Sequence, residues 1–133
     1  MIKKRVTEDS LSKITNLGKI NDSNVINVGK FLVDNFAQNV IIYDVQNKTP
    51  FVSYYIVASS KNDYRMKKLV LDAKEALIKY GYEIDHIEGK NKSKWILIDS
   101  KDVVVQLFTK EERNNVKFDE LYLDCNHMII ESK

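Results

Sequence analysis

The chain has 133 residues, of which 44% are hydrophobic and 30% charged, with 21 Lys and Arg against 19 Asp and Glu. This length suits one domain with one modest core, and the balanced composition argues against disorder. A net charge of +2, carried mostly by lysine, argues against a protein that grips nucleic acid by its phosphates.

Cysteine usage and targeting signals indicate a reducing, cytosolic setting. A single cysteine, Cys125, allows neither an internal disulfide nor a cysteine-based metal cluster. The basic residues 1–5 are followed by the polar residues 6–10, where a signal peptide would have an apolar run. No apolar stretch approaches the roughly 20 residues that a membrane-spanning helix needs. We therefore expect a soluble, cytoplasmic protein that does not associate with a membrane.

The first third of the chain is predicted to hold an extension and the start of a domain. Residues 1–22 form the extension, and helical spacing within it is shown by Leu11, Ile14 and Leu17. Residues 23–133 form a single α/β domain. It begins with a helix over 24–37, whose apolar stripe comprises Val25, Val28, Leu32 and Phe36. Two β-branched runs follow, 40–45 and 54–58, which are close enough in sequence to pair as a hairpin.

The strongest helical pattern runs from Asn62, a predicted N-cap, to Gly81, a predicted C′ residue. Its apolar stripe comprises Met66, Leu69, Val70, Ala73, Leu77 and Tyr80. We expect a half-apolar strand over 82–87 and then a polar turn over 88–93. Residues 109–112, Thr-Lys-Glu-Glu, match a capping box that opens a short helix. The segment after this helix is predicted to be anchored by Phe118, Leu121 and Tyr122.

Residues 95–99 and 103–108 are predicted to form a β-hairpin with a two-residue loop, Ser100 and Lys101. In this register Asp99 faces Asp102, Leu97 faces Val104 and Trp95 faces Gln106. One side of the hairpin then carries aliphatic side chains alone and must be core: Ile96, Ile98, Val103, Val105 and Leu107.

The other side of this hairpin carries Trp95, Leu97 and Val104, rimmed by carboxylates. An apolar patch with a charged rim is typical of a binding surface. The alternative is that the N-terminal helix covers this side and makes Trp95 part of the core, and both interpretations stay open. The whole order, α-β-β-α-β-β-β-α, indicates an α+β fold: a mixed sheet of about five strands with helices mainly on one face.

Acids and hydroxyls that could carry chemistry form no specific pattern. Asp99 and Asp102, with Glu88 nearby, could gather a divalent cation, but carboxylates beside a tight turn are more often turn residues. Ser59-Ser60, between a strand and a helix, could meet a phosphate, but no glycine-rich cradle accompanies it. We therefore expect no metal, no cofactor and no enzymatic activity.

Histidine and cysteine lead to the same expectation. His86 and His127 lack the spacing of metal ligands and are expected to be exposed or edge residues. Cys125 would be a nucleophile only if a histidine approached it, so it is interpreted as an ordinary thiol.

Segments over about residues 24–124 match, in order, the pattern of one family. They are a β-branched run ending in Asp44-Val45, the run Ser53-Tyr54-Tyr55-Ile56-Val57, the pair Glu88-Gly89, Trp95-Ile96-Leu97-Ile98-Asp99 followed by Asp102-Val103-Val104-Val105, and Arg113 through Tyr122. Together they resemble the Iojap family of ribosomal silencing factors. The chain departs from the pattern in several places. Gln106 stands for the family's usual His, Lys101 for its Gly, Val116 for Tyr, Asp119 for Glu and Tyr122 for Trp, and the Ser-x-Arg-Gln start of the long helix is blurred into residues 62–65.

The resemblance implies a nucleotidyltransferase-like topology without the paired catalytic acids. It also implies docking on ribosomal protein fourteen of the large ribosomal subunit, which blocks subunit joining and represses translation. Members are often dimers, so a homodimer is an expectation, whereas direct sequence-specific contact with nucleic acid is not. The partner-binding residues implied by this likeness are Trp95, Leu97, Asp99, Asp102, Val104, Gln106 and Arg113.

Two rival functions remain as alternatives. A divergent nucleotidyltransferase-fold enzyme would need the Gly-Ser and paired-acid motif, which the sequence lacks. An RNA-binding module could stack bases on Tyr54, Tyr55 and Trp95, but Asp99 and Asp102 share the Trp95 side of the hairpin and would repel phosphate.

Overall fold

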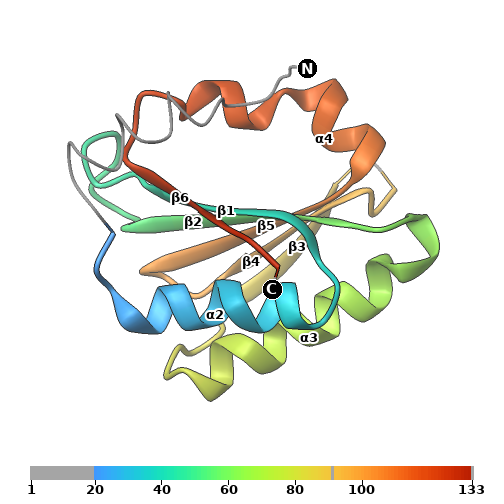
Figure 1. Ribbon diagram of the computed structural model, residues 1–133, viewed down its shortest axis with the longest axis horizontal. Helices are drawn as coiled ribbons and strands as arrows, with labels where there is room; N and C mark the ends of the chain where they lie inside the picture. The colour runs from blue at the N-terminus through green and yellow to red at the C-terminus, as the bar shows by residue number, and fades with distance from the viewer. Residues whose placement is uncertain (1–19, 91, 133) are drawn as a thin grey trace.

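A computed structural model describes residues 20–90 and 92–132 of the chain, which form a six-stranded sheet with helices on both faces (Figure 1). The strands are β1 (Gln38–Asp44), β2 (Tyr54–Ser60), β3 (His86–Lys90), β4 (Trp95–Asp99), β5 (Val103–Thr109) and β6 (His127–Ile130). The helical segments are α2 (Ser23–Asp34), η1 (Asp63–Arg65), α3 (Met66–Lys79), α4 (Lys110–Val116) and η2 (Phe118–Leu121). The helix expected around Leu11, Ile14 and Leu17 lies outside the described residues.

The strand order is β3-β4-β5-β2-β1-β6. Neighbours pair antiparallel, except β2 and β5, which run parallel at the centre. The predicted hairpin of the two β-branched runs is confirmed as β1–β2, with Ile42 opposite Ile56. The mixed sheet of an α+β fold is therefore confirmed, with six strands instead of about five. Among the described residues, no helix is long and apolar enough to cross a membrane.

Helices α2 and α3 cover one face of the sheet, and α4 with η2 lies over the other (Figure 1). The first face holds an aliphatic core, which includes Val28, Leu32, Ile42, Ile56, Leu77, Ile98 and Val105. The second holds an aromatic core of Tyr43, Val45, Val57, Phe108, Phe118 and Cys125. The two long helices share one face as predicted, while the short C-terminal helix closes the opposite one. Ile20, which precedes the predicted domain boundary, is buried in the aliphatic core.

Helix α2 is shorter than the predicted 24–37 because Asn35 caps it. Phe36 then takes a positive φ of 73° and is 70% exposed, so its placement on the apolar stripe was wrong. Close packing explains the glycine at position 29 within this helix. A Cβ there would lie 3.0 Å from Ile130 Cγ1 and 3.3 Å from Ile42 Cδ1. Glycine therefore lets the helix approach the sheet closely.

Helix α3 agrees closely with its sequence pattern. Asn62 is confirmed as a cap, although it caps the 3-10 turn η1, where its side chain accepts from the Arg65 N–H at 3.0 Å. Gly81 has a φ of 93°, as a C′ residue requires. The inward residues of α3 are buried against the aliphatic core, namely Met66, Leu69, Ala73, Ala76 and Leu77.

The β4–β5 hairpin has the predicted faces but a different register. Trp95 lies opposite Phe108, Leu97 opposite Gln106 and Asp99 opposite Val104, so each predicted pair is shifted by two residues. Because side chains alternate with a period of two, an even shift leaves every residue on its predicted face. The aliphatic side is confirmed as core, since Ile98, Val103, Val105 and Leu107 are fully buried.

Both edges of the sheet differ from the prediction. The strand expected over 82–87 lies instead at His86–Lys90, so Glu88 and Gly89 belong to β3 and not to a turn. All five residues of β3 are exposed, which left no apolar alternation in the sequence. At the opposite edge, the four residues of β6 pair antiparallel with β1 and were not predicted.

Candidate functional site

Helix α4 begins directly after β5 and turns back over the sheet face that carries Trp95. Thr109 is confirmed as the N-cap: its hydroxyl accepts a hydrogen bond from the Glu112 N–H at 3.2 Å, while the Thr109 backbone N–H donates to the Lys94 carbonyl oxygen and not to a capping-box partner. The helix ends at Lys117, whose φ of 56° is left-handed, and η2 follows at once. This path brings Phe118 of η2 onto Tyr55 and Phe108, with ring centroids 5.7 and 5.6 Å away.

Trp95 lies at the margin of the aromatic core. Its ring stacks on Phe108 at 5.0 Å with an interplanar angle of 25°, and meets Phe118 edge-on at 6.1 Å. The indole N–H donates to Gln106 Oε1 at 2.8 Å, and the Lys90 ammonium lies 5.7 Å from the ring centroid. Trp95 is half-buried. Trp95 is therefore neither fully exposed nor part of the buried core. The helical segment that contacts it is η2, not the N-terminal helix.

One carboxylate fastens the α4–η2 segment to the sheet. Asp119 accepts from Arg113 Nε at 2.8 Å, from Arg113 Nη2 at 3.0 Å and from the Tyr43 hydroxyl at 2.5 Å. Arg113 Nη1 also donates to the backbone oxygen of Asn39 and to the Ser59 hydroxyl. The guanidinium is thus engaged within the protein, and Arg113, implied as partner-binding by the family resemblance, is itself buried.

The cover that α4 and η2 provide stops short of the β3–β4 edge. There Leu97 and Asp99 are half-buried, next to the exposed residues His86 and Glu88 of β3. Asp102, in the β4–β5 turn, is exposed and accepts from the Ser53 hydroxyl at 2.6 Å. We call Trp95, Leu97, Asp99 and Asp102 the β4 strip. It places two apolar side chains beside two carboxylates, while Val104, the third apolar residue predicted for this side of the hairpin, is buried.

The seven residues implied as partner-binding separate into two groups. Four of them form the β4 strip, which is open at least in part. The other three lie beneath the surface, because Val104 is 5%, Gln106 3% and Arg113 8% exposed. Gln106 supports Trp95 through its hydrogen bond. Arg113 supports η2 through Asp119.

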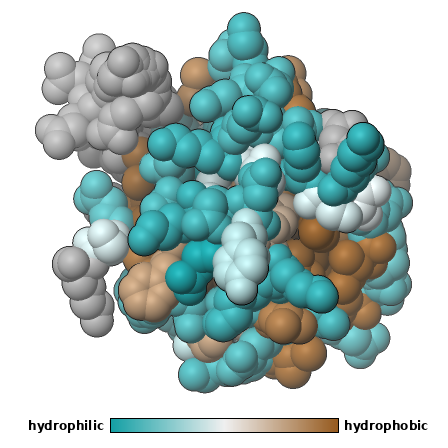
Figure 2. All heavy atoms as spheres, turned by 90° about the vertical axis from the view of Figure 1, so that its right-hand side faces the viewer, coloured by the Kyte–Doolittle hydropathy of each residue, from teal (hydrophilic) through white to brown (hydrophobic). Residues whose placement is uncertain are grey.

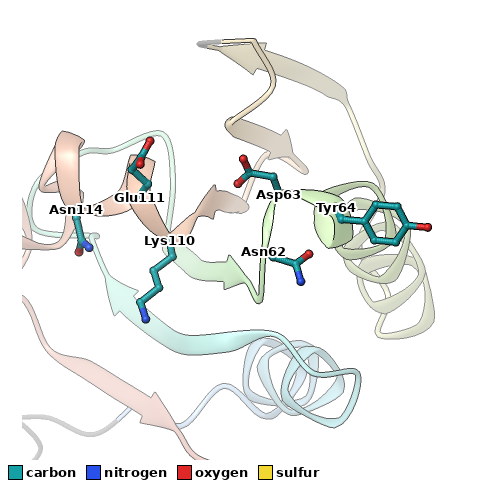
Figure 3. A pocket seen from close by; sticks show the side chains of 6 residues that line it. All are labelled: Asn62, Asp63, Tyr64, Lys110, Glu111 and Asn114. Atoms are coloured by element: carbon teal, nitrogen blue, oxygen red, sulfur yellow. The ribbon is translucent and has the colours of Figure 1, made fainter.

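A shallow depression of about 650 Å³ lies where η1 and α4 begin (Figure 3). It is lined by Asn62, Asp63, Tyr64, Lys110, Glu111 and Asn114. Figure 3 shows Tyr64 directed away from the α4 side chains, and the six residues do not converge on one point. Figure 2 shows this end of the molecule largely covered by hydrophilic residues, with apolar side chains gathered toward one side. The depression therefore has none of the enclosure expected of a substrate pocket.

Cys125 and His127 are both buried. Cys125 is 8% exposed in the aromatic core, where burial raises the pKa of its thiol, the opposite of what a nucleophile requires. His127 lies on an edge strand as expected but is buried, at 1% exposure. Its Nδ1 lies 3.1 Å from the Cys125 carbonyl oxygen, which can accept but not donate. Burial lowers the pKa of His127 and keeps the ring neutral.

Known proteins resemble this chain in sequence and in fold. Residues 19–133 match the family model described as ribosomal silencing factor during starvation. The ribosomal silencing factor RsfS of Bacillus subtilis is 24% identical over 92 residues, covering 69% of this chain and 78% of the relative. RsfS of Halalkalibacterium halodurans is 25% identical over 92 residues, covering 69% and 79%.

Two crystal structures share the fold. A Chromobacterium violaceum protein superposes with a TM-score of 0.68 at 24% identity, covering 75% of this chain and 83% of the other. A Bacillus halodurans protein superposes with a TM-score of 0.65 at 21% identity, covering 84% and 100%.

Proposed function

Because the chain belongs to the ribosomal silencing factor family, whose model matches residues 19–133, we propose that it represses translation by binding the large ribosomal subunit. Its direct partner would be ribosomal protein fourteen of that subunit. Bound there, the protein blocks joining of the small subunit. This activity takes place in the cytoplasm and requires no cofactor.

The observation that carries this proposal is the β4 strip. Trp95 presents a half-buried ring held in a fixed orientation by Phe108 and Gln106. A rigid, partly exposed aromatic beside an aliphatic side chain is typical of the residues that dominate protein–protein binding energy. Asp99 and Asp102 then supply polar contacts at the rim, and the buried residues Gln106 and Arg113 hold the strip in place.

The charge of the strip favours a protein partner over RNA. Its two polar members are carboxylates, and His86 and Glu88 border it on β3. Carboxylates repel a phosphate backbone, and the chain's overall charge of +2 offers little compensation. A basic surface of the ribosomal partner would be complementary to this rim.

Sedimentation of cell extract tests the proposal. The protein should travel with free large subunits and be absent from small subunits, and adding it to purified subunits should reduce the yield of joined ribosomes. Protein found only with small subunits, or with RNA stripped of protein, contradicts the proposal. Equilibrium sedimentation of the free protein tests the expected homodimer separately.

The enzyme alternative has its own test. Calorimetry with the four nucleoside triphosphates and magnesium should give no binding signal. A magnesium-dependent signal that disappears in Asp99→Asn would support a nucleotidyltransferase-fold enzyme instead.

A further inference from the structure

We propose that Asp85, His86 and Asp99 form a binding site for a divalent transition metal ion, with zinc as the best-matched ion. The antiparallel pairing of β3 and β4 places His86 directly opposite Asp99. Asp85 precedes β3 and donates its backbone N–H to the Asp99 carbonyl at 2.7 Å. Because Asp85 is outside the regular strand, its carboxylate can turn toward the imidazole on the same face.

The distances between the donor atoms match those around a single ion. His86 Nδ1 lies 3.2 Å from Asp85 Oδ2 and 3.7 Å from Asp99 Oδ2. All three donor atoms lie within 4.8 Å of one another. Ligands that sit roughly 2.0–2.1 Å from a tetrahedral zinc ion are separated by about 3.3 Å, so one ion could contact all three after small side-chain rotations.

A backbone hydrogen bond orients one of the three donors, and a carboxylate lies near a second. Asp99 Oδ1 accepts from the Lys101 backbone N–H at 2.7 Å, which leaves Oδ2 directed at the imidazole. Glu88 Oε1 lies 3.5 Å from His86 Nε2, the ring nitrogen on the side away from the proposed ion. A histidine that binds a metal generally donates its second N–H to such a carboxylate, which fixes the ring and strengthens the ligand. This arrangement distinguishes the site from an ordinary group of surface acids.

The chemistry of the donors selects the class of ion. A neutral imidazole and two carboxylates balance a divalent charge, and imidazole suits zinc, nickel and copper more than magnesium or calcium. The His86 side chain is 46% exposed and that of Asp99 27%, so water or a donor from a partner completes the coordination. The sequence concealed the site, because β3 was expected to end at residue 87, with Glu88 in a turn, and no pairing of His86 with Asp99 was foreseen.

Calorimetric titration of untagged, chelator-treated protein with zinc tests the site. The chain has two histidines, and His127 is 1% exposed, so His86 is the imidazole that solvent ions can reach. We expect saturable binding of one zinc ion per chain. His86→Ala and Asp99→Asn should each abolish it, and Glu88→Gln should weaken it by about tenfold. Asp102→Asn, which removes an exposed carboxylate nearby, is the matched control and should bind as the parent does.

Two further measurements make the result decisive. Nuclear magnetic resonance should show the ring signals of His86 shifting with zinc while those of His127 stay in place. Zinc and a proton compete for Nδ1, so binding should weaken in acid, where the imidazole is protonated. Absence of saturation at millimolar zinc, unchanged binding by His86→Ala, pH-independent binding, or equally tight binding of magnesium would each overturn the proposal.

Discussion

Arg113 and Asp119 form a two-pronged ion pair, with Nε donating to Oδ2 at 2.8 Å and Nη2 to Oδ1 at 3.0 Å. Their side chains are 8% and 27% exposed, so the pair is shielded from most of the solvent. Burial by itself raises the pKa of Asp119, but the Arg113 guanidinium and the Tyr43 hydroxyl hold it below its ordinary value. This pair therefore sets the position of η2, and through Phe118 the environment of Trp95.

The first prediction concerns removal of this arginine. Arg113→Ala should lower the free energy of unfolding by about 3 kcal/mol, because it leaves the Asp119 carboxylate partly buried without its partner. Urea denaturation measures the loss. Arg113→Lys keeps the charge but not the forked geometry and should fall between the parent and Arg113→Ala. A change within error of the parent for both variants would show that the pair does not hold η2 in place.

A second prediction separates binding from folding at the β4 strip. Leu97→Ser should weaken large-subunit binding by about 2 kcal/mol or more, as expected of a residue at the centre of an interface. It should cost little stability, since Leu97 is half-buried. Trp95→Ala should reduce both binding and stability, the latter by about 2 kcal/mol, because the ring also packs on Phe108.

The matched control for both variants is Ile98→Ala, on the opposite face of β4. Ile98 is fully buried in the aliphatic core, so truncation should cost about 2–4 kcal/mol of stability. The protein that remains folded should bind the large subunit as the parent does. Full binding by a folded Leu97→Ser variant would remove the β4 strip from the proposed interface.

Gly29 supplies a third prediction. An alanine Cβ would lie 3.0 Å from Ile130 Cγ1, tighter than ordinary contact. The gain in helix propensity, about 1 kcal/mol, opposes an overpacking cost of about 1–3 kcal/mol. We expect Gly29→Ala to be destabilising overall by about 1 kcal/mol in thermal or urea unfolding. Adding Ile130→Ala should relieve the contact, so that the double variant is more stable than the two separate losses predict. Strict additivity would contradict this account.

A fourth prediction concerns acid. Burial lowers the pKa of His127 below its ordinary value of 6.5. The unfolded chain therefore binds this proton more readily, so the contribution to stability is complete above about pH 6.5 and is lost as the pH falls below it. Protonation would also put an N–H at Nε2, for which no described residue provides an acceptor.

Unfolding free energies measured across this pH range test the effect. His127→Gln should flatten the dependence of the unfolding free energy on pH below about pH 6.5. His86 has the opposite sign, since its pKa is raised: its contribution is complete below about pH 6.5 and fades as the pH rises above that value. His86→Ala should therefore remove the decline on the alkaline side and leave the loss in acid unchanged. A slope that is identical in the parent and in His127→Gln would show that another group is responsible.

The central elements were predictable because their burial leaves a strong pattern in the sequence. The fully buried run of β5, the β-branched run of β1 and the apolar stripe of α3 are examples. The edges were not predictable on the same basis. β3 is exposed along its whole length. β6 has only four residues, too few to show a strand pattern.

The arrangement of the β4–β5 hairpin was predicted in outline and missed in detail. The face carrying Trp95 was identified from alternation alone. The register was wrong because the loop was placed one residue too early, which shifts each pairing by two: Lys101, with a φ of 71°, and Asp102 form the turn, between Ser100 and Val103. That η2 would contact Trp95 depends on the left-handed turn at Lys117. A left-handed lysine has no local sequence signal. The partners of Arg113 that are distant in sequence, Asn39 and Ser59, have none either.

The pairing of β6 with β1 also bears on how the chain is made. The residues between Val40 and its partner Ile130, roughly 90 of them, take about 5–18 s to synthesise at ~5–20 residues per second. Throughout this interval the nascent chain carries β1 with one row of backbone groups unpaired, which is a template for aggregation. The edge of β1 that β6 covers is therefore closed only after residues 127–130 have been synthesised.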